Sequence, residues 1–166
     1  SSANQNAFQY FNKVGSTNKT ITVQAWIYLI GDNANLKMPI IYRSVSGGTS
    51  FSMYVQNNKG YFSVGNSNTV STPEFPSFQW IQLTGIYDGT NLKIYYGKNL
   101  AQSIATPLNN PYQTGVGLFV GKSGEGAFKG LIDEIRIFNT PLGDNNINGS
   151  GGNGNPAEPF PSSLSQ

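Results

Sequence analysis

Residues 128–142 read FKGLIDEIRIFNTPL, and this stretch decides the fold. From Leu131 to Ile137 every odd position is aliphatic except Asp133. Strict alternation of this kind predicts a strand with one buried face, and it places Asp133 on that face. Pro141 ends the strand, because proline cannot donate a hydrogen bond to a ladder. Burial of an unpaired carboxylate is costly, so Asp133 needs a partner and is a candidate metal ligand.

Runs of period two recur along the chain, and runs with a helical period are scarce. Turn signals rich in Gly, Asn and Asp separate these runs. Many strands joined by close turns predict an all-β sandwich. A single helical turn is expected after Pro141, over residues 142–147. Strands are predicted over residues 7–12, 19–30, 38–43, 50–56, 61–64, 78–87, 92–96, 117–121 and 128–139.

Five segments, taken in order, resemble strands of the laminin G-like, concanavalin A-like jelly rolls. They are TITVQAWI at residues 20–27, QWIQLTGIYDG at 79–89, LKIYYGK at 92–98, LFVG at 118–121 and the stretch at 128–142. The resemblance covers residues 5–147. It implies a two-sheet antiparallel jelly-roll sandwich, concanavalin A-like, in which the first and last strands pair.

Composition excludes several kinds of chemistry. The chain of 166 residues has the length of one domain. It contains no Cys and no His, so disulfides, thiolate catalysis and the commonest general base and zinc ligand are absent. The formal charge is +2 without any run of basic residues, which argues against nucleic acid as a partner. No apolar stretch reaches the ~18 residues that span a bilayer, so we do not expect this segment to insert into a membrane.

The chain changes character near its end. From Gly143 onward it is rich in Gly, Asn and Pro, and such sequence cannot bury enough surface to order itself. We therefore expect a laminin G-like domain over residues 1–147 and a linker or tail over residues 148–166.

The resemblance implies a role for Asp133. In the resembling folds a carboxylate at this place on the last strand helps to hold a structural calcium ion, together with backbone carbonyls. Calcium takes 6–8 oxygen ligands. The alternative is that Asp133 accepts hydrogen bonds from backbone N–H groups.

Catalysis is not expected. Glycosidases need two carboxylates about 5–9.5 Å apart across the sugar bond, and the resembling enzymes carry a Glu-x-Asp-x-Glu strand. None of the eight acidic residues alternates with another along one strand face. Asp133 and Glu134 are adjacent, so alternation directs them to opposite faces.

Two groups of residues are candidates for ligand binding. Trp26 shares the polar face of its strand with Gln24, and an aromatic ring beside amides suits a sugar platform; the alternative is a core position. The strands between residues 40 and 64 carry a second group, in which Arg43 would be a bidentate donor to an acidic sugar. The alternative for that group is that its members are ordinary half-exposed strand residues with no binding role. Its members are Arg43, Tyr54, Gln56 and Tyr61.

We therefore expect a non-catalytic binding or adhesion module, extracellular or at a cell surface. Its expected ligand is a glycan first and a surface protein second. The alternative is a structural subunit of a surface filament, pilus or cell-surface layer, joined to other domains or copies. The loops at residues 31–37, 45–49 and 66–75 are further candidates for recognition, because binding often lies on loops held by a rigid sandwich.

Overall fold

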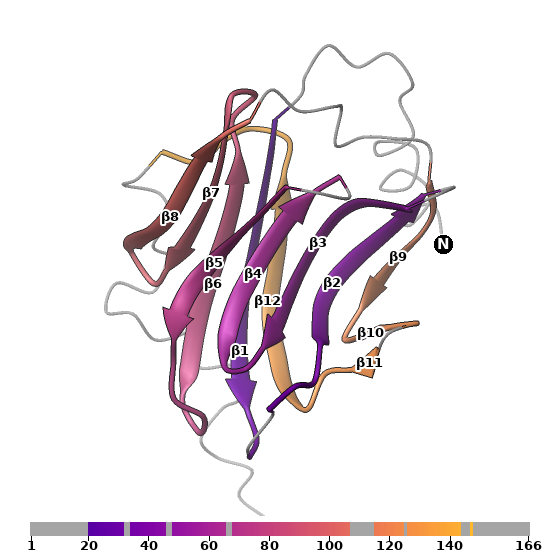
Figure 1. Ribbon diagram of the computed structural model, residues 1–166, viewed down its shortest axis with the longest axis vertical. Helices are drawn as coiled ribbons and strands as arrows, with labels where there is room; N and C mark the ends of the chain where they lie inside the picture. The colour runs from indigo at the N-terminus through magenta and orange to yellow at the C-terminus, as the bar shows by residue number, and fades with distance from the viewer. Residues whose placement is uncertain are drawn as a thin grey trace, which may run out of the picture.

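The computed structural model describes residues 20–31, 34–45, 48–65, 68–106, 115–124, 126–143 and 147. Over these ranges the chain forms two packed antiparallel sheets of five strands each, with no helix (Figure 1). The predicted all-β jelly-roll sandwich is thus confirmed. These ranges also hold no helix long and apolar enough to cross a membrane.

Each sheet is named here by its strand order. Sheet A runs β12-β1-β6-β7-β8, and sheet B runs β5-β4-β3-β2-β9. A short hairpin of β10 (Lys122–Ser123) and β11 (Gly126–Ala127) lies beside β2 and β9. Sheet A comprises β12 (Gly130–Phe138), β1 (Ile21–Leu29), β6 (Trp80–Tyr87), β7 (Asn91–Tyr96) and β8 (Asn99–Ala105). Sheet B comprises β5 (Asn68–Glu74), β4 (Lys59–Val64), β3 (Gly48–Gln56), β2 (Met38–Val45) and β9 (Gly115–Val120).

The core lies between the inner faces of the two sheets. Alternate residues of β1 and β3 supply much of it, because side chains along a strand point to opposite faces in turn. In β3 the inner residues are Phe51, Met53 and Val55, all fully buried. The sheets approach closely where β6 crosses β4, since a side chain added at Gly85 would overlap the ring of Phe62.

The outer face of sheet A is also covered near β1. Thr22 and Gln24 point outward there, yet they are 0% and 2% exposed. Gln24 Nε2 donates to the Ile147 carbonyl at 2.6 Å, and Thr22 Oγ1 donates to the Thr140 carbonyl at 2.8 Å. The segment that follows β12 therefore folds back across β1, and Ile147 is buried beside Ile86. Both faces of β1 are buried as a result.

A β-bulge in β12 places Asp133 on the outer face of sheet A, not on the predicted core face. Ile132 pairs with the core residue Ile27, and Asp133 pairs with the outward-facing Trp26. The register then shifts across Glu134, whose φ is 47°. One extra residue reverses the alternation. The prediction that Asp133 shares the core face with the aliphatic residues of its strand is therefore wrong.

Four strands were absent from the sequence prediction, namely β5, β8 and the two-residue strands β10 and β11. Strand β5 occupies most of residues 66–75, which were expected to form a loop, and β8 follows a tight turn after β7. The strand predicted at residues 7–12 and the tail at 148–166 lie outside the described residues. So does part of the helical turn predicted at residues 142–147.

Candidate functional site

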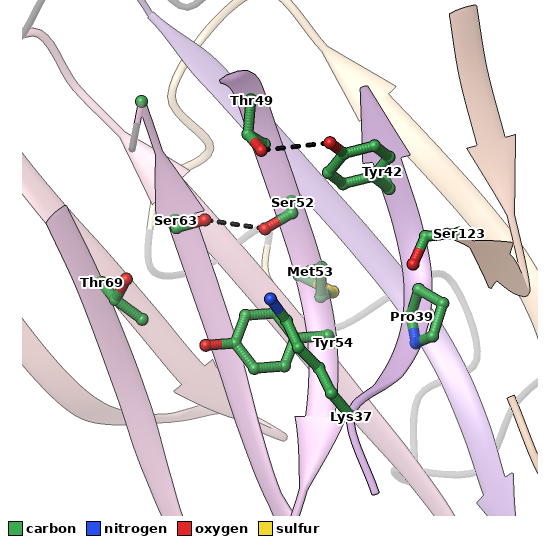
Figure 2. A pocket seen from close by; sticks show the side chains of 11 residues that line it. Lys37, Pro39, Tyr42, Thr49, Ser52, Met53, Tyr54, Ser63, Thr69 and Ser123 are labelled. Atoms are coloured by element: carbon green, nitrogen blue, oxygen red, sulfur yellow. Dashed lines mark hydrogen bonds between the residues drawn. The ribbon is translucent and has the colours of Figure 1, made fainter. Parts of the chain in front are cut away.

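A groove of about 260 Å³ lies on the outer face of sheet B. Strands β2, β3, β4 and β5 form its base, and the β10 hairpin adds one edge (Figure 2). The described lining residues are mostly small hydroxyl residues and tyrosines. They are Lys37, Pro39, Tyr42, Thr49, Ser52, Met53, Tyr54, Ser63, Gly65, Thr69 and Ser123.

Strand pairing brings these side chains together. In β3 the core residues alternate with Ser52 and Tyr54, which therefore face outward. Ser52 lies opposite Ser63 of β4, and Tyr54 lies opposite Tyr61. Directly opposed residues on an antiparallel pair are neighbours on the same face. The outer face of sheet B thus carries a row of hydroxyls beside a row of tyrosines.

The floor of the groove is a hydrogen-bonded pair of serines. The Oγ atoms of Ser52 and Ser63 are 2.7 Å apart, and each residue is 7% exposed. At the rim, Thr49 Oγ1 donates to Tyr42 Oη at 3.3 Å (Figure 2). One proton of the serine pair is not used in the bond between them, so the floor can still donate to a ligand.

The ring of Tyr54, which lines the groove, is stacked on the ring of Tyr61, which lies outside the lining set. The rings of Tyr54 and Tyr61 are 4.9 Å apart and nearly parallel, at 6°. Lys37 Nζ lies 4.6 Å from the centre of the Tyr54 ring, and Figure 2 shows the lysine alongside that ring. Tyr61 comes from β4 and Lys37 directly precedes β2, and these two strands flank β3 on opposite sides. The Tyr54 ring is therefore held between an aromatic ring and an ammonium group.

The predicted ligand-binding residues of sheet B separate into two groups. Tyr54 lines the groove, while Tyr61 and Gln56 lie on the same face outside the lining set. Arg43 instead pairs with the core residue Phe51, so it points between the sheets and is 2% exposed. This burial lowers the pKa of the Arg43 guanidinium from its ordinary value. The prediction that Arg43 contacts a ligand on the outer face is therefore wrong.

Trp26 is not an open platform. It faces outward from sheet A as predicted, but it is only 5% exposed, between Asp133 of β12 and Gln82 of β6. A sugar cannot stack on a ring that the protein already covers. The structure favours the alternative interpretation of Trp26 as a core residue.

Asp133 fits a metal site only in part. Its Oδ1 accepts from the Glu134 backbone N–H at 2.8 Å, and its buried Oδ2 has no hydrogen-bond partner. That orphan oxygen is a suitable calcium ligand. Over the described ranges, however, no three acidic, His or Cys side chains come together. Any further ligands would be backbone carbonyls or water, and calcium binding at Asp133 stays a prediction.

Sequence reasoning missed most of the groove. Ser52 and Ser63 follow from alternation once β3 and β4 are paired, so their signal was present in the sequence. Lys37, Thr49 and Thr69 fall within the three loops named as further candidates for recognition. Ser123 had no signal, because it lies in a two-residue strand.

A sandwich of two antiparallel sheets with a polar and aromatic groove on one outer face is the architecture of a lectin-like β-sandwich. The chain matches the family model of the concanavalin A-like lectin/glucanases superfamily over residues 3–148. It belongs to that superfamily.

Solved structures share this fold at low sequence identity. Domain 4 of AbnA, an extracellular arabinanase from Geobacillus stearothermophilus solved with arabinotriose, is similar at a TM-score of 0.62 and 17% identity, over 78% of this chain and 65% of that one. A SAP-like pentraxin from Limulus polyphemus has a TM-score of 0.60 and 17% sequence identity, over 78% of this chain and 68% of that one. A structure of botulinum neurotoxin type C, whose cell entry depends on interaction with two ganglioside molecules, has a TM-score of 0.59 and 17% sequence identity. The match covers 87% of this chain and 36% of that one. A comparison with curated protein sequences found no match.

Proposed function

We propose that the chain is a non-catalytic glycan-binding module that acts outside the cell or at its surface. The observation that carries the proposal is the groove on sheet B, where the Tyr54 and Tyr61 stack stands beside the Ser52 and Ser63 hydroxyls. Aromatic rings pack against the CH faces of sugars, and nearby hydroxyls exchange hydrogen bonds with sugar hydroxyls. One structure of similar fold was solved with arabinotriose, and another belongs to a neurotoxin whose cell entry depends on two ganglioside molecules; both support this choice of ligand.

The size of the groove suits a short stretch of glycan. Its volume of about 260 Å³ lies near the lower end of the ~300–1,000 Å³ range of small-molecule sites. A few ring and hydroxyl contacts give weak binding to one site. Binding would strengthen if several copies or domains acted together on one polymer.

Charge placement supports a role without catalysis. None of the lining residues that the structure describes is acidic. Three of the described carboxylates lie in ion pairs elsewhere, namely Glu74 with Lys59, Asp88 with Lys93 and Glu134 with Arg136. Hydrolysis of a glycosidic bond needs two carboxylates that flank the sugar, and the described walls of this groove supply none.

A glycan array followed by titration calorimetry tests the proposal. We expect Tyr54→Ala to weaken binding by about tenfold or more, because it removes the ring that faces the groove. Tyr28→Ala is the matched control, since Tyr28 packs on Trp80 on the outer face of sheet A. Glycan binding that Tyr54→Ala leaves intact, or no binding to any glycan, would overturn the proposal.

One observation favours the alternative of a structural subunit. Phe119 and Val120 of β9 are 47% and 53% exposed, and β9 is an edge strand of sheet B as described. An exposed apolar edge strand can pair with another chain. Sedimentation over a range of concentrations would show association that Phe119→Ser abolishes; a monomer at every concentration would rule the alternative out.

A further inference from the structure

We propose that the outer face of sheet A carries a second binding surface, which takes an extended apolar peptide segment of another protein. The surface lies where β1 ends and where β6 and β12 begin (Figure 1). It is called here the sheet A platform, and its members are Tyr28, Ile30, Phe78, Trp80 and Leu131. Binding there is independent of the groove on sheet B.

One row of side chains across three strands forms the centre of the sheet A platform. Tyr28 of β1 pairs with Leu131 of β12 on one side and with Trp80 of β6 on the other, so all three face outward. The rings of Tyr28 and Trp80 are 5.6 Å apart and tilted by 59°. Leu131 is 48% exposed, and Ile30 at the end of β1 is 52% exposed. An exposed apolar row with aromatic members is typical of a contact surface between proteins.

Phe78 completes the sheet A platform in a strained conformation. Its backbone N–H donates to the Leu29 carbonyl at 3.0 Å, which fixes it beside the end of β1. Its φ of 64° is in the left-handed region, which bulky residues rarely adopt, and its side chain is 63% exposed. Strained residues of this kind collect at functional sites. A partner that covers the ring would offset both the strain and the exposure.

The same face already binds a peptide segment of the chain itself. Thr22 Oγ1 donates to the Thr140 carbonyl at 2.8 Å and accepts from the Leu142 N–H at 3.1 Å. Gln24 Nε2 donates to the Ile147 carbonyl at 2.6 Å, and the Ile147 side chain is fully buried. Outward hydroxyl and amide groups thus hold a backbone beside a buried apolar anchor. The sheet A platform continues this face along β1, beyond the end that the segment covers.

Two polar groups next to the sheet A platform need partners. Trp26, in the row beside Tyr28, lies between Asp133 and Gln82. In the part of the chain that the structure describes, the buried Nε2 of Gln82 and the buried Oδ2 of Asp133 have no hydrogen-bond partner. A calcium ion would satisfy the carboxylate oxygen but not the amide nitrogen, because that nitrogen is a donor. A peptide backbone supplies both a carbonyl for the amide and an N–H for the carboxylate.

These features favour a peptide over other occupants. The most exposed members of the sheet A platform are aliphatic or phenyl side chains, which cannot pair with the hydroxyls around a sugar ring. Two copies placed platform to platform would join apolar to apolar and leave Gln82 and Asp133 without partners. An extended segment instead places alternate side chains on the platform and offers its backbone to the polar groups.

Selection from a phage-displayed library of random dodecapeptides tests the inference. The bait is the full chain in chelator, so that calcium does not compete for Asp133, and enriched peptides are synthesised and titrated by calorimetry and indole fluorescence. We expect apolar sequences that change indole emission, because Trp80 belongs to the sheet A platform. No enrichment, or binding without a change in indole emission, would overturn the inference and leave the proposed glycan binding standing.

Substitutions then assign the peptides to the sheet A platform. Leu131→Ser should weaken their binding by about tenfold. Phe78→Gly should do the same without lowering stability, because glycine adopts a φ of 64° without strain. Leu100→Ser is the control, since Leu100 is 52% exposed on the same sheet but outside the platform. Equal binding by Leu131→Ser and the native chain would contradict the inference.

Two rival occupants give results of their own. A synthetic peptide of residues 148–166 that displaces the selected peptides would assign the surface to the chain's own tail. Sedimentation that shows association of the native chain but not of Leu131→Ser would assign it to a second copy. Either result would overturn the assignment to a segment of another protein.

Discussion

The outer faces of the two sheets carry similar residues in different surroundings. On sheet A, the outward-facing Gln24 and Trp26 are 2% and 5% exposed, and the segment after β12 crosses β1. On sheet B, the outward-facing Tyr54 lines an open groove. An aromatic residue beside polar neighbours therefore marks a binding surface only when nothing later in the chain covers it. The four predictions below test this contrast between a covered face and an open one.

The largest effect is expected where the sheets meet, because both outer faces depend on that contact. A side chain at Gly85 would overlap the ring of Phe62. Gly85→Ala should lower the free energy of unfolding by about 3 kcal/mol or more, through overpacking. Gly124→Ala is the control, since its added carbon would meet nothing within 4 Å. Denaturant melts compare the two, and equal stabilities would contradict the packing described here.

The next effect separates the two faces. Ile147 is fully buried on the outer side of sheet A, so Ile147→Ala should lower the free energy of unfolding by about 2–3 kcal/mol. Leu100→Ala, at a side chain that is 52% exposed, should change it by less than about 0.5 kcal/mol. Glycan affinity should be the same in both variants under native conditions. A loss of affinity in Ile147→Ala alone would show that the covered face and the groove are coupled.

A smaller effect is expected at the turn between β6 and β7. Burial alone would raise the pKa of Asp88, but the hydrogen bonds from Lys93 and from the backbone of Asn91 and Thr90 outweigh it and hold the pKa well below its usual range. The folded state therefore binds this proton less readily than the unfolded state. The stabilisation is complete above about pH 5 and is lost as pH falls below the ordinary Asp value of about 4.

Asp88→Ala should thus lower the free energy of unfolding by about 1 kcal/mol at neutral pH and by less in acid. Asp88→Asn keeps an oxygen for the backbone N–H groups and loses only the ion pair with Lys93. Its free energy of unfolding at neutral pH should therefore lie between those of the native chain and Asp88→Ala. Melts at pH 3 and pH 7 make the comparison. A loss in Asp88→Ala as large at pH 3 as at pH 7 would contradict the role given to the carboxylate.

The smallest effect concerns Asp133 on the covered face. If calcium satisfies the orphan Oδ2, the metal should raise the melting temperature by about 3 °C at tenfold excess over its dissociation constant. The same addition should have no effect on Asp133→Asn. Equal melting temperatures of the native chain in calcium and in chelator would remove the calcium prediction.

The sequence correctly predicted the fold, but it did not predict on which face of their sheets Asp133 and Arg43 lie. Alternation identified both faces of β1 correctly, because that strand pairs with β6 without interruption. It failed at Asp133, where the register shifts near Glu134. The placement of Arg43 on the ligand-binding face was also wrong, because a bulge between Pro39 and Ile41 turns the later residues of β2 over. One inserted residue moves every later side chain of the strand to the opposite face of the sheet. No residue type predicts such an insertion reliably.

The groove was only partly predictable for a different reason. Tyr54 and Tyr61 stand out as aromatic residues on neighbouring strands, and the turn between β3 and β4 fixes their pairing. Lys37 reaches the groove from the segment before β2, and its position depends on how the strands lie side by side in sheet B. Contacts of that kind depend on tertiary packing, so they produce no periodic pattern in the sequence.

The distribution of tryptophan gives the molecule a built-in optical reporter. Its two indoles, Trp26 and Trp80, both belong to sheet A, whereas the groove on sheet B is lined by phenols. A ligand that enters the groove should therefore alter the near-ultraviolet signal of tyrosine and leave indole emission constant. Unfolding should change both signals, so fluorescence can distinguish occupancy from loss of structure without any added dye.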